Sequence, residues 1–162
     1  MKLVIRSIVV GALGVAACGG GGESDQPKSV TAEYDAYMLK SKSVEAQLRL
    51  NSLKNSLKAT LFEKDGFPVG TVPATPAKPC CASGGKCAPD PAAWAAEVWQ
   101  ALDFTMDDPH YFQYAYTSDG RTVRVTAVGD LDCDGTTIEY VLEGTAAGGE
   151  PTFTLTEPAK LD

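Results

Sequence analysis

Several sequence patterns that accompany catalysis are missing from this 162-residue chain. It contains one histidine, His110, and it has neither a Gly-x-Ser-x-Gly segment nor a glycine-rich phosphate loop. His110 is preceded by Asp107, Asp108 and Pro109. A histidine that acts as a general base needs a positioned partner, and the sequence pattern around His110 does not indicate one. We therefore interpret His110 as a surface histidine at the start of a strand and expect that the protein is not an enzyme.

Long apolar runs are also missing. The run Ile8 to Ala17 follows the basic residues Lys2 and Arg6 and ends at Cys18. A membrane-spanning helix needs about 20 apolar residues. This run is too short to span, and its basic start and small-residue end are typical of a signal peptide.

The segment Val15-Ala16-Ala17-Cys18 resembles the bacterial lipobox. The resemblance implies that residues 1–17 are a lipoprotein signal peptide and that lipid on Cys18 attaches the chain to a membrane. Gly19 lacks the aspartate that retains enterobacterial lipoproteins at the inner membrane, which favours the outer membrane. Residues 18–29, with four consecutive glycines, are then a lipidated flexible tether, and residues 30–162 form the folded domain. The alternative is an ordinary signal peptide cleaved nearby, with Cys18 incidental.

Basic residues are outnumbered. The chain has 14 Lys and Arg against 21 Asp and Glu, and removal of residues 1–17 takes away two basic residues, which leaves a net charge near −9. This balance argues against nucleic acid as a partner and against a polybasic contact with anionic lipid headgroups. Divalent cations and basic surfaces are the natural counterparts.

Four cysteines follow Cys18, namely Cys80, Cys81, Cys87 and Cys133. In an exported protein an even number predicts two disulfides out of three possible connectivities. Adjacent cysteines rarely bond to each other, so we expect one of Cys80 or Cys81 to pair with Cys87 and the other with Cys133. A zinc site built from these thiols, with His110, is the alternative, but the paired Cys-x-x-Cys spacing is absent.

A long amphipathic helix is predicted from near Thr31 to Lys64, because this segment contains no glycine or proline. One stripe at helical spacing comprises Leu39, Ala46, Leu50, Leu53, Leu57 and Leu61. A thinner apolar row lies on the opposite side and comprises Tyr37, Val44, Leu48 and Phe62. We interpret Tyr37, Val44 and Leu48 as a candidate partner surface; the alternative is that the chain's own loops cover them or that they are scattered surface residues.

The rest of the sequence predicts an irregular loop, a short helix and a sheet. Residues 69–91 are rich in Pro, Gly and Ala, and residues 92–102 carry Trp94, Val98, Trp99 and Leu102 at helical spacing. Alternation with a period of two then marks strands at 111–117, 122–128, 137–142 and 152–156. The expected fold is α+β, with one long N-terminal helix packed on an antiparallel sheet of about four strands and a disulfide-stapled loop.

Several segments together resemble the type IV pilins and pseudopilins. Residues 40–48 resemble the lower half of the pilin spine helix, and Gly66-Phe67-Pro68 resembles its exit. Residues 99–104, 111–116 and 127–136 resemble parts of the globular head. The hydrophobic half-helix that forms the filament core has no counterpart here. The resemblance therefore implies a pilin-like head displayed on a membrane, which contacts pilus or pseudopilus components without being a core filament subunit.

The segment Asp130-x-Asp132-x-Asp134-Gly135 spaces three carboxylates as the first half of an EF-hand loop does. It predicts a weak calcium site, with Glu139 or Glu143 replacing the missing twelfth-position glutamate. A solvated acidic turn is the alternative reading of the segment. The corresponding alternative function is a surface calcium-binding or adhesive lipoprotein unrelated to filaments.

Overall fold

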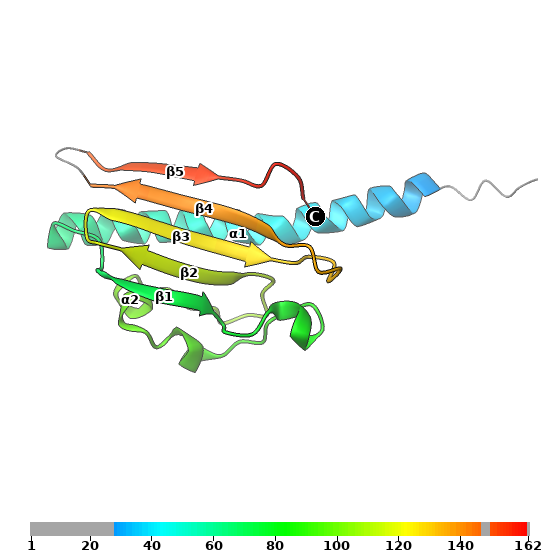
Figure 1. Cartoon of the computed structure of the whole chain (residues 1–162), viewed down its shortest axis with the longest axis horizontal. Helices are drawn as coiled ribbons and strands as arrows, with labels where there is room; N and C mark the ends of the chain where they lie inside the picture. The colour runs from blue at the N-terminus through cyan, green and yellow to red at the C-terminus, as the bar shows by residue number, and fades with distance from the viewer. Residues whose placement is uncertain (1–27, 147–149, 162) are drawn as a thin grey trace, which may run out of the picture.

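The computed structural model describes residues 28–146 and 150–161. The predicted signal peptide at 1–17, the lipidation of Cys18 and the tether up to residue 27 lie outside this part of the chain. Helix α1 spans Lys28–Lys64 and lies along one face of a sheet, and its N-terminal turns extend past the end of the sheet (Figure 1). None of the helices in the described ranges is apolar over enough length to cross a bilayer.

Five strands form one antiparallel sheet in the order of the sequence. They are β1 (Gly70–Thr75), β2 (Gln113–Ser118), β3 (Thr122–Gly129), β4 (Ile138–Thr145) and β5 (Thr152–Thr156). The α+β prediction is confirmed, but the sheet has five strands where about four were expected. Strand β1 lies in the segment predicted as loop. Its Pro73 is tolerated because β1 is an edge strand and a central strand would lose a ladder hydrogen bond there.

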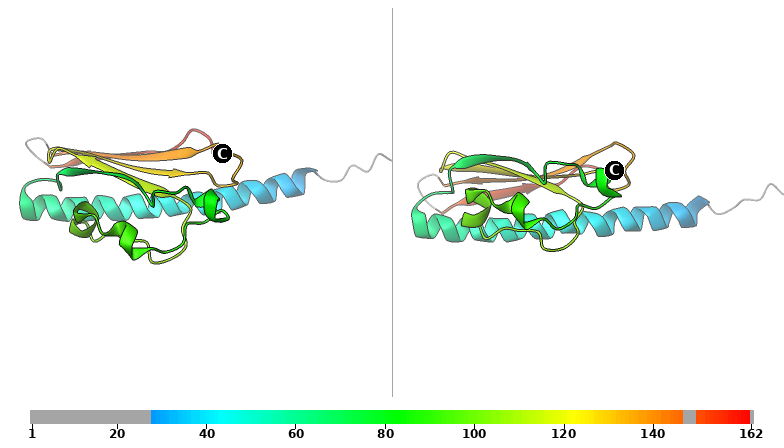
Figure 2. Two further views of the ribbon diagram at one scale, coloured as in Figure 1. Left: turned by 60° about the horizontal axis from the view of Figure 1, so that its bottom comes forward. Right: turned by 90° about the horizontal axis from the view of Figure 1, so that it is seen from below.

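The long connection between β1 and β2 passes beside the sheet and carries three short helices (Figure 2). These are the 3₁₀ turns Cys80–Ser83 and Pro91–Trp94 and helix α2 (Glu97–Ala101). The single helix predicted over 92–102 is wrong, because the extended backbone of Ala96 divides it. Five helical residues turn through about 500°, so a continuous helix would place Trp94 and Trp99 on different faces. The break lets both indoles enter the core with ring centroids 5.7 Å apart.

The core lies between α1 and the sheet. The predicted stripe of α1 is confirmed, since Ala46, Leu50, Leu53 and Leu57 are fully buried and Leu39 and Leu61 are partly buried. The inward-facing side chains of the three central strands alternate with exposed or partly exposed ones, except at Val141, which is buried at an outward position. They include Tyr114, Tyr116, Val123, Val125, Ala127, Tyr140 and Leu142.

Candidate functional site

The outward face of α1 carries an exposed apolar row. Tyr37 is 68% exposed, Leu48 65% and Val44 40%, and Val30 and Tyr34 extend the same face toward the N-terminus. We call these five residues the outer row; their successive spacings of four, three, seven and four residues keep them on one side of the helix. Within the described ranges no loop of the chain covers them, so the alternative of burial under the chain's own loops is wrong.

The middle of the outer row borders a groove. Val44 lines a depression of about 230 Å³ between α1 and the C-terminal segment 157–161. Gln47 Nε2 donates a hydrogen bond to Glu157 Oε1 across it, at 2.9 Å. This contact holds the C-terminal segment against α1, so the row and the groove form one continuous surface. The sequence indicated the row but gave no sign of the groove.

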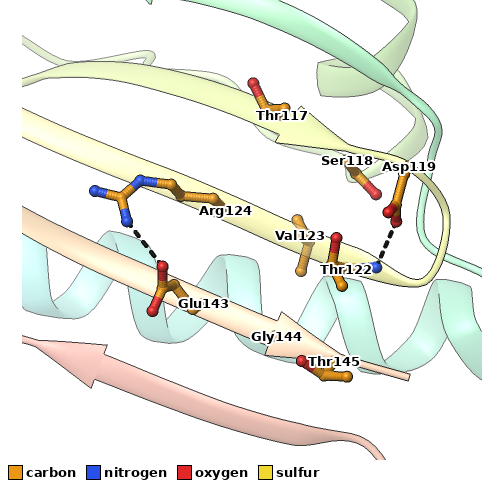
Figure 3. Close-up of a pocket in the computed structure, with 9 residues that line it drawn as sticks. All are labelled: Thr117, Ser118, Asp119, Thr122, Val123, Arg124, Glu143, Gly144 and Thr145. Carbon is orange, nitrogen blue, oxygen red and sulfur yellow. Dashed lines mark hydrogen bonds and ion pairs between the residues drawn. The ribbon is translucent and has the colours of Figure 1, made fainter. Parts of the chain in front are cut away.

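A second depression, of about 470 Å³, lies on the other face of the sheet near the β2–β3 turn (Figure 3). Its charged groups are already paired: Arg124 forms ion pairs with Glu143 at 2.8 Å and with Glu139 at 4.0 Å. Asp119 accepts backbone hydrogen bonds from Thr122 and Arg121, which lower the pKa of its carboxyl group. The polar groups here close the turn and the strand pair, and they do not converge on a ligand.

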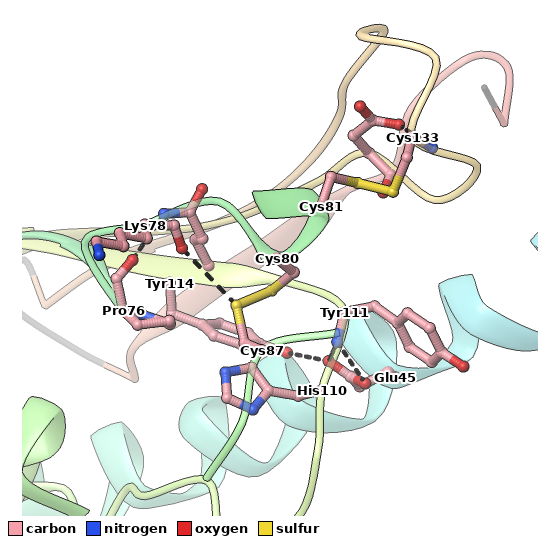
Figure 4. The surroundings of a disulfide bond; sticks show 12 residues. Glu45, Pro76, Lys78, Cys80, Cys81, Cys87, His110, Tyr111, Tyr114 and Cys133 are labelled. Carbon is pink, nitrogen blue, oxygen red and sulfur yellow. Dashed lines mark hydrogen bonds between the residues drawn. A yellow bond between two sulfur atoms is a disulfide. The ribbon is translucent and has the colours of Figure 1, made fainter. Parts of the chain in front are cut away.

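The two disulfides are Cys80–Cys87 and Cys81–Cys133 (Figure 4). The first closes the loop on itself, and the second joins it to the β3–β4 connection. This is one of the two pairings expected from the sequence, and the alternative of a zinc site built from these thiols is therefore wrong for the disulfide-bonded protein. Gly84 and Gly85, both at positive φ, allow the chain to return sharply between Cys80 and Cys87.

The carboxylates of Asp130, Asp132 and Asp134 come together in the β3–β4 connection, within 4.8 Å of one another. Each accepts backbone hydrogen bonds inside the loop. Asp130 accepts from Cys133 and Gly135, Asp132 accepts from Asp134, and Asp134 accepts from Thr136. The bond from Thr136 lowers the pKa of Asp134. These oxygens have the chemistry that calcium prefers.

The rest of an EF-hand ligand set does not join these carboxylates. The twelfth position counted from Asp130 is Val141, which is buried in β4. Glu139 and Glu143, the predicted replacements, form ion pairs with Arg124 instead. The cluster therefore offers three side-chain carboxylates and no bidentate fourth, which fits at most a weak site.

His110 is 1% exposed, so its interpretation as a surface histidine is wrong. Its backbone pairs with that of Cys87 in an isolated antiparallel bridge, which draws it under the stapled loop. The ring packs edge-on against Trp94 with centroids 6.0 Å apart. Burial lowers the pKa of His110, so the neutral imidazole is favoured. Lone histidines preceded by Asp-Asp-Pro look exposed in sequence, and only the long-range bridge to Cys87 reveals the burial.

Glu45 is a partly buried acidic group that sequence reasoning missed. Both of its carboxylate oxygens lie 3.1 Å from the backbone nitrogen of Tyr111, and the Tyr114 hydroxyl lies 3.5 Å from Oε1 (Figure 4). These contacts join α1 to the entry of β2. Desolvation by burial raises the pKa of Glu45, although the hydrogen bonds and nearby Arg49 partly oppose the shift.

Glu45 predicts a defined pH dependence of stability. Because its pKa in the folded protein lies above the ordinary 4.5, the folded state retains a proton that the unfolded chain has released, between 4.5 and the higher value. The free energy of unfolding should therefore fall as pH rises through this window, relative to a Glu45→Gln variant. Urea unfolding of both proteins from about pH 4 to about pH 8 measures the difference. If the free energy of unfolding of the unaltered protein stays constant or rises with pH relative to that of the Glu45→Gln variant, the raised pKa of Glu45 is contradicted.

Comparison with protein-family models, curated proteins and solved structures finds no match to this chain. The fold thus defines its class as an α+β protein in which one long helix packs across a five-stranded antiparallel sheet.

Proposed function

We propose that the protein is a lipid-anchored, pilin-like interaction module of the cell envelope, which contacts type IV pilus or secretion pseudopilus components without being a core filament subunit. The observation that carries the proposal is the outer row of α1. Five large apolar side chains lie exposed on the face of the helix opposite the stripe that covers the sheet. Large apolar side chains exposed in a row along one helix face are typical of a docking site for another protein.

The N-terminal turns of α1 support the same proposal. Every residue from Val30 to Tyr37 is exposed, because this part of the helix extends beyond the sheet (Figures 1 and 2). Most of the stability of a helix in a protein comes from packing of its apolar face, so this unpacked extension gains stability when it packs against a partner. The resemblance of residues 40–48 to a pilin spine helix suggests that the partner is itself a helical filament or assembly component.

Affinity capture tests this function. The tagged full-length protein is incubated with solubilised envelope and sheared filaments, alongside a Tyr37→Ser/Val44→Ser/Leu48→Ser variant, and bound proteins are identified by mass spectrometry. We expect the unaltered protein to capture at least about tenfold more pilins, pseudopilins or their assembly proteins than the triple variant does. A loss of about 1.4 kcal/mol of binding free energy lowers the affinity tenfold.

The matched control is Val69→Ser, which removes an exposed apolar side chain away from the outer row. It should capture the same proteins as the unaltered chain. Equal capture by the triple variant, or no filament component in any eluate, would refute the filament connection.

The alternative is a surface calcium-binding or adhesive lipoprotein. The observation that favours it is the convergence of the three carboxylates of Asp130, Asp132 and Asp134. Capture with calcium and with a chelator separates the two functions. Calcium-dependent binding that survives the triple substitution in the outer row would support the alternative.

A further inference from the structure

The stapled loop buries a group of side chains suited to a soft metal ion. The two sulfur atoms of Cys80 and Cys87 and an imidazole nitrogen of His110 lie within 4.8 Å of one another. All three residues are at most 5% exposed. The His110 ring lies next to the Cys80–Cys87 bond (Figure 4). A disulfide explains the two sulfurs, but it does not explain why the one histidine of the chain is buried beside them.

The hydrogen bonding of His110 leaves one nitrogen unused. Nδ1 lies 3.1 Å from the backbone oxygen of Asp108, which can only accept, so the proton belongs on Nδ1. Nε2 then carries a lone pair, and among the described residues it is a buried side-chain atom without a hydrogen-bond partner. Histidines that bind metals generally donate their other N–H group to a carbonyl or carboxylate, which orients the ring. His110 has this arrangement.

The backbone holds the three residues in place independently of the S–S bond. Cys87 N donates to His110 O at 2.8 Å, and His110 N donates to Cys87 O at 3.1 Å. Gly85 N donates to Cys80 O at 3.2 Å and closes the turn that carries Cys80. These bonds do not involve sulfur, so they can persist when the disulfide is reduced.

We propose that Cys80, Cys87 and His110 bind one Cu(I) ion when the Cys80–Cys87 disulfide is reduced. A dithiol supplies two electrons and two protons to the disulfide and itself becomes a disulfide, which yields two thiols. Binding of Cu(I) displaces both thiol protons to solvent, and the third ligand is the Nε2 lone pair. Soft thiolates select Cu(I), and the three donors suit it better than zinc, which takes four. The second disulfide offers a contrast, since Cys81 and Cys133 are grouped with the carboxylate of Asp130 and are less buried.

The test uses the full-length chain with Cys18→Ala, Cys81→Ala and Cys133→Ala, so that only Cys80 and Cys87 carry thiols. The protein is reduced with a dithiol, desalted without oxygen and titrated with Cu(I) supplied as its bathocuproine disulfonate complex. We expect one ion bound per chain, no binding by the oxidised protein, and affinity at least about tenfold weaker after His110→Asn. A rise in the melting temperature of the reduced protein on adding Cu(I) is expected by mass action.

Circular dichroism of the reduced protein provides the structural control. Retention of the sheet signal, together with His110-dependent binding, supports a site built by the fold. Equal affinity in the His110→Asn variant, binding by the oxidised protein, or loss of the sheet on reduction of a variant whose oxidised form retains it would each overturn the proposal. If the oxidised variant has no sheet, the chain that keeps Cys81 and Cys133 is titrated instead, with Cys80→Ala/Cys87→Ala as the control, and equal binding by the two proteins would overturn the proposal.

Discussion

Replacing Leu50 with alanine is expected to lower the free energy of unfolding by about 2–5 kcal/mol, whereas replacing Leu48 should change it by less than about 0.5 kcal/mol. The two leucines are two residues apart in α1 and differ only in the face they occupy. Leu50 is fully buried against the sheet, and Leu48 is 65% exposed. Alanine at position 50 buries less apolar surface on folding than leucine does. The substitution also leaves a cavity in a close-packed core.

Urea unfolding of the two variants and the unaltered protein measures this contrast. Alanine has a helix propensity slightly better than leucine, so loss of helix formation does not confound either substitution. A large loss for Leu48→Ala would show that the outer row is covered within the isolated protein and would remove the main support for a docking surface. A small loss for Leu50→Ala would contradict the packing of α1 on the sheet.

Removing the Cys81–Cys133 disulfide by double alanine substitution is expected to cost about 4 kcal/mol, and removing Cys80–Cys87 about 2.5 kcal/mol. The reason is the length of chain that each bond closes in the unfolded state. Cys81 and Cys133 are 52 residues apart, and Cys80 and Cys87 are seven apart. Cross-linking the longer segment removes more conformational entropy from the unfolded chain.

Denaturant unfolding of both double variants under oxidising conditions tests the order of these losses. The Cys81–Cys133 bond also ties the loop that carries Cys80, Cys81 and Cys87 to the β3–β4 connection. Its loss should therefore also release the β3–β4 connection, which carries the three aspartates. A larger loss for the Cys80→Ala/Cys87→Ala variant would contradict the entropic account and show that packing of the two buried sulfurs dominates.

The periodicity of apolar residues predicted the long helix and the strands whose pattern lies within a single segment of the chain. The helix stripe from Leu39 to Leu61 was confirmed because a run of 34 residues without glycine or proline leaves little alternative to a helix. The structure begins this helix at Lys28, close to the predicted start near Thr31. The last four strands were also found, since each alternates apolar and polar residues and ends at turn residues.

Features that depend on contacts between distant segments of the chain could not be predicted from the sequence. Strand β1 reads as loop because of Gly70 and Pro73, and only its pairing with β2 makes it a strand. The burial of His110 depends on its bridge to Cys87, 23 positions earlier in the chain, and that of Glu45 on the backbone of Tyr111, 66 positions later. Polar residues like these look exposed until their partners are known.

Our central proposal is that lipid on Cys18 holds this domain at a membrane with the outer row of α1 available to a partner. Membrane fractionation of cells expressing the full-length chain, with mass spectrometry of the mature N-terminal peptide, tests the anchor most directly. The account predicts a chain that begins at an acylated Cys18 and remains with the membrane, and a Cys18→Ala variant that is neither acylated nor membrane-bound. An unmodified Cys18 in a chain recovered from the soluble fraction would contradict it.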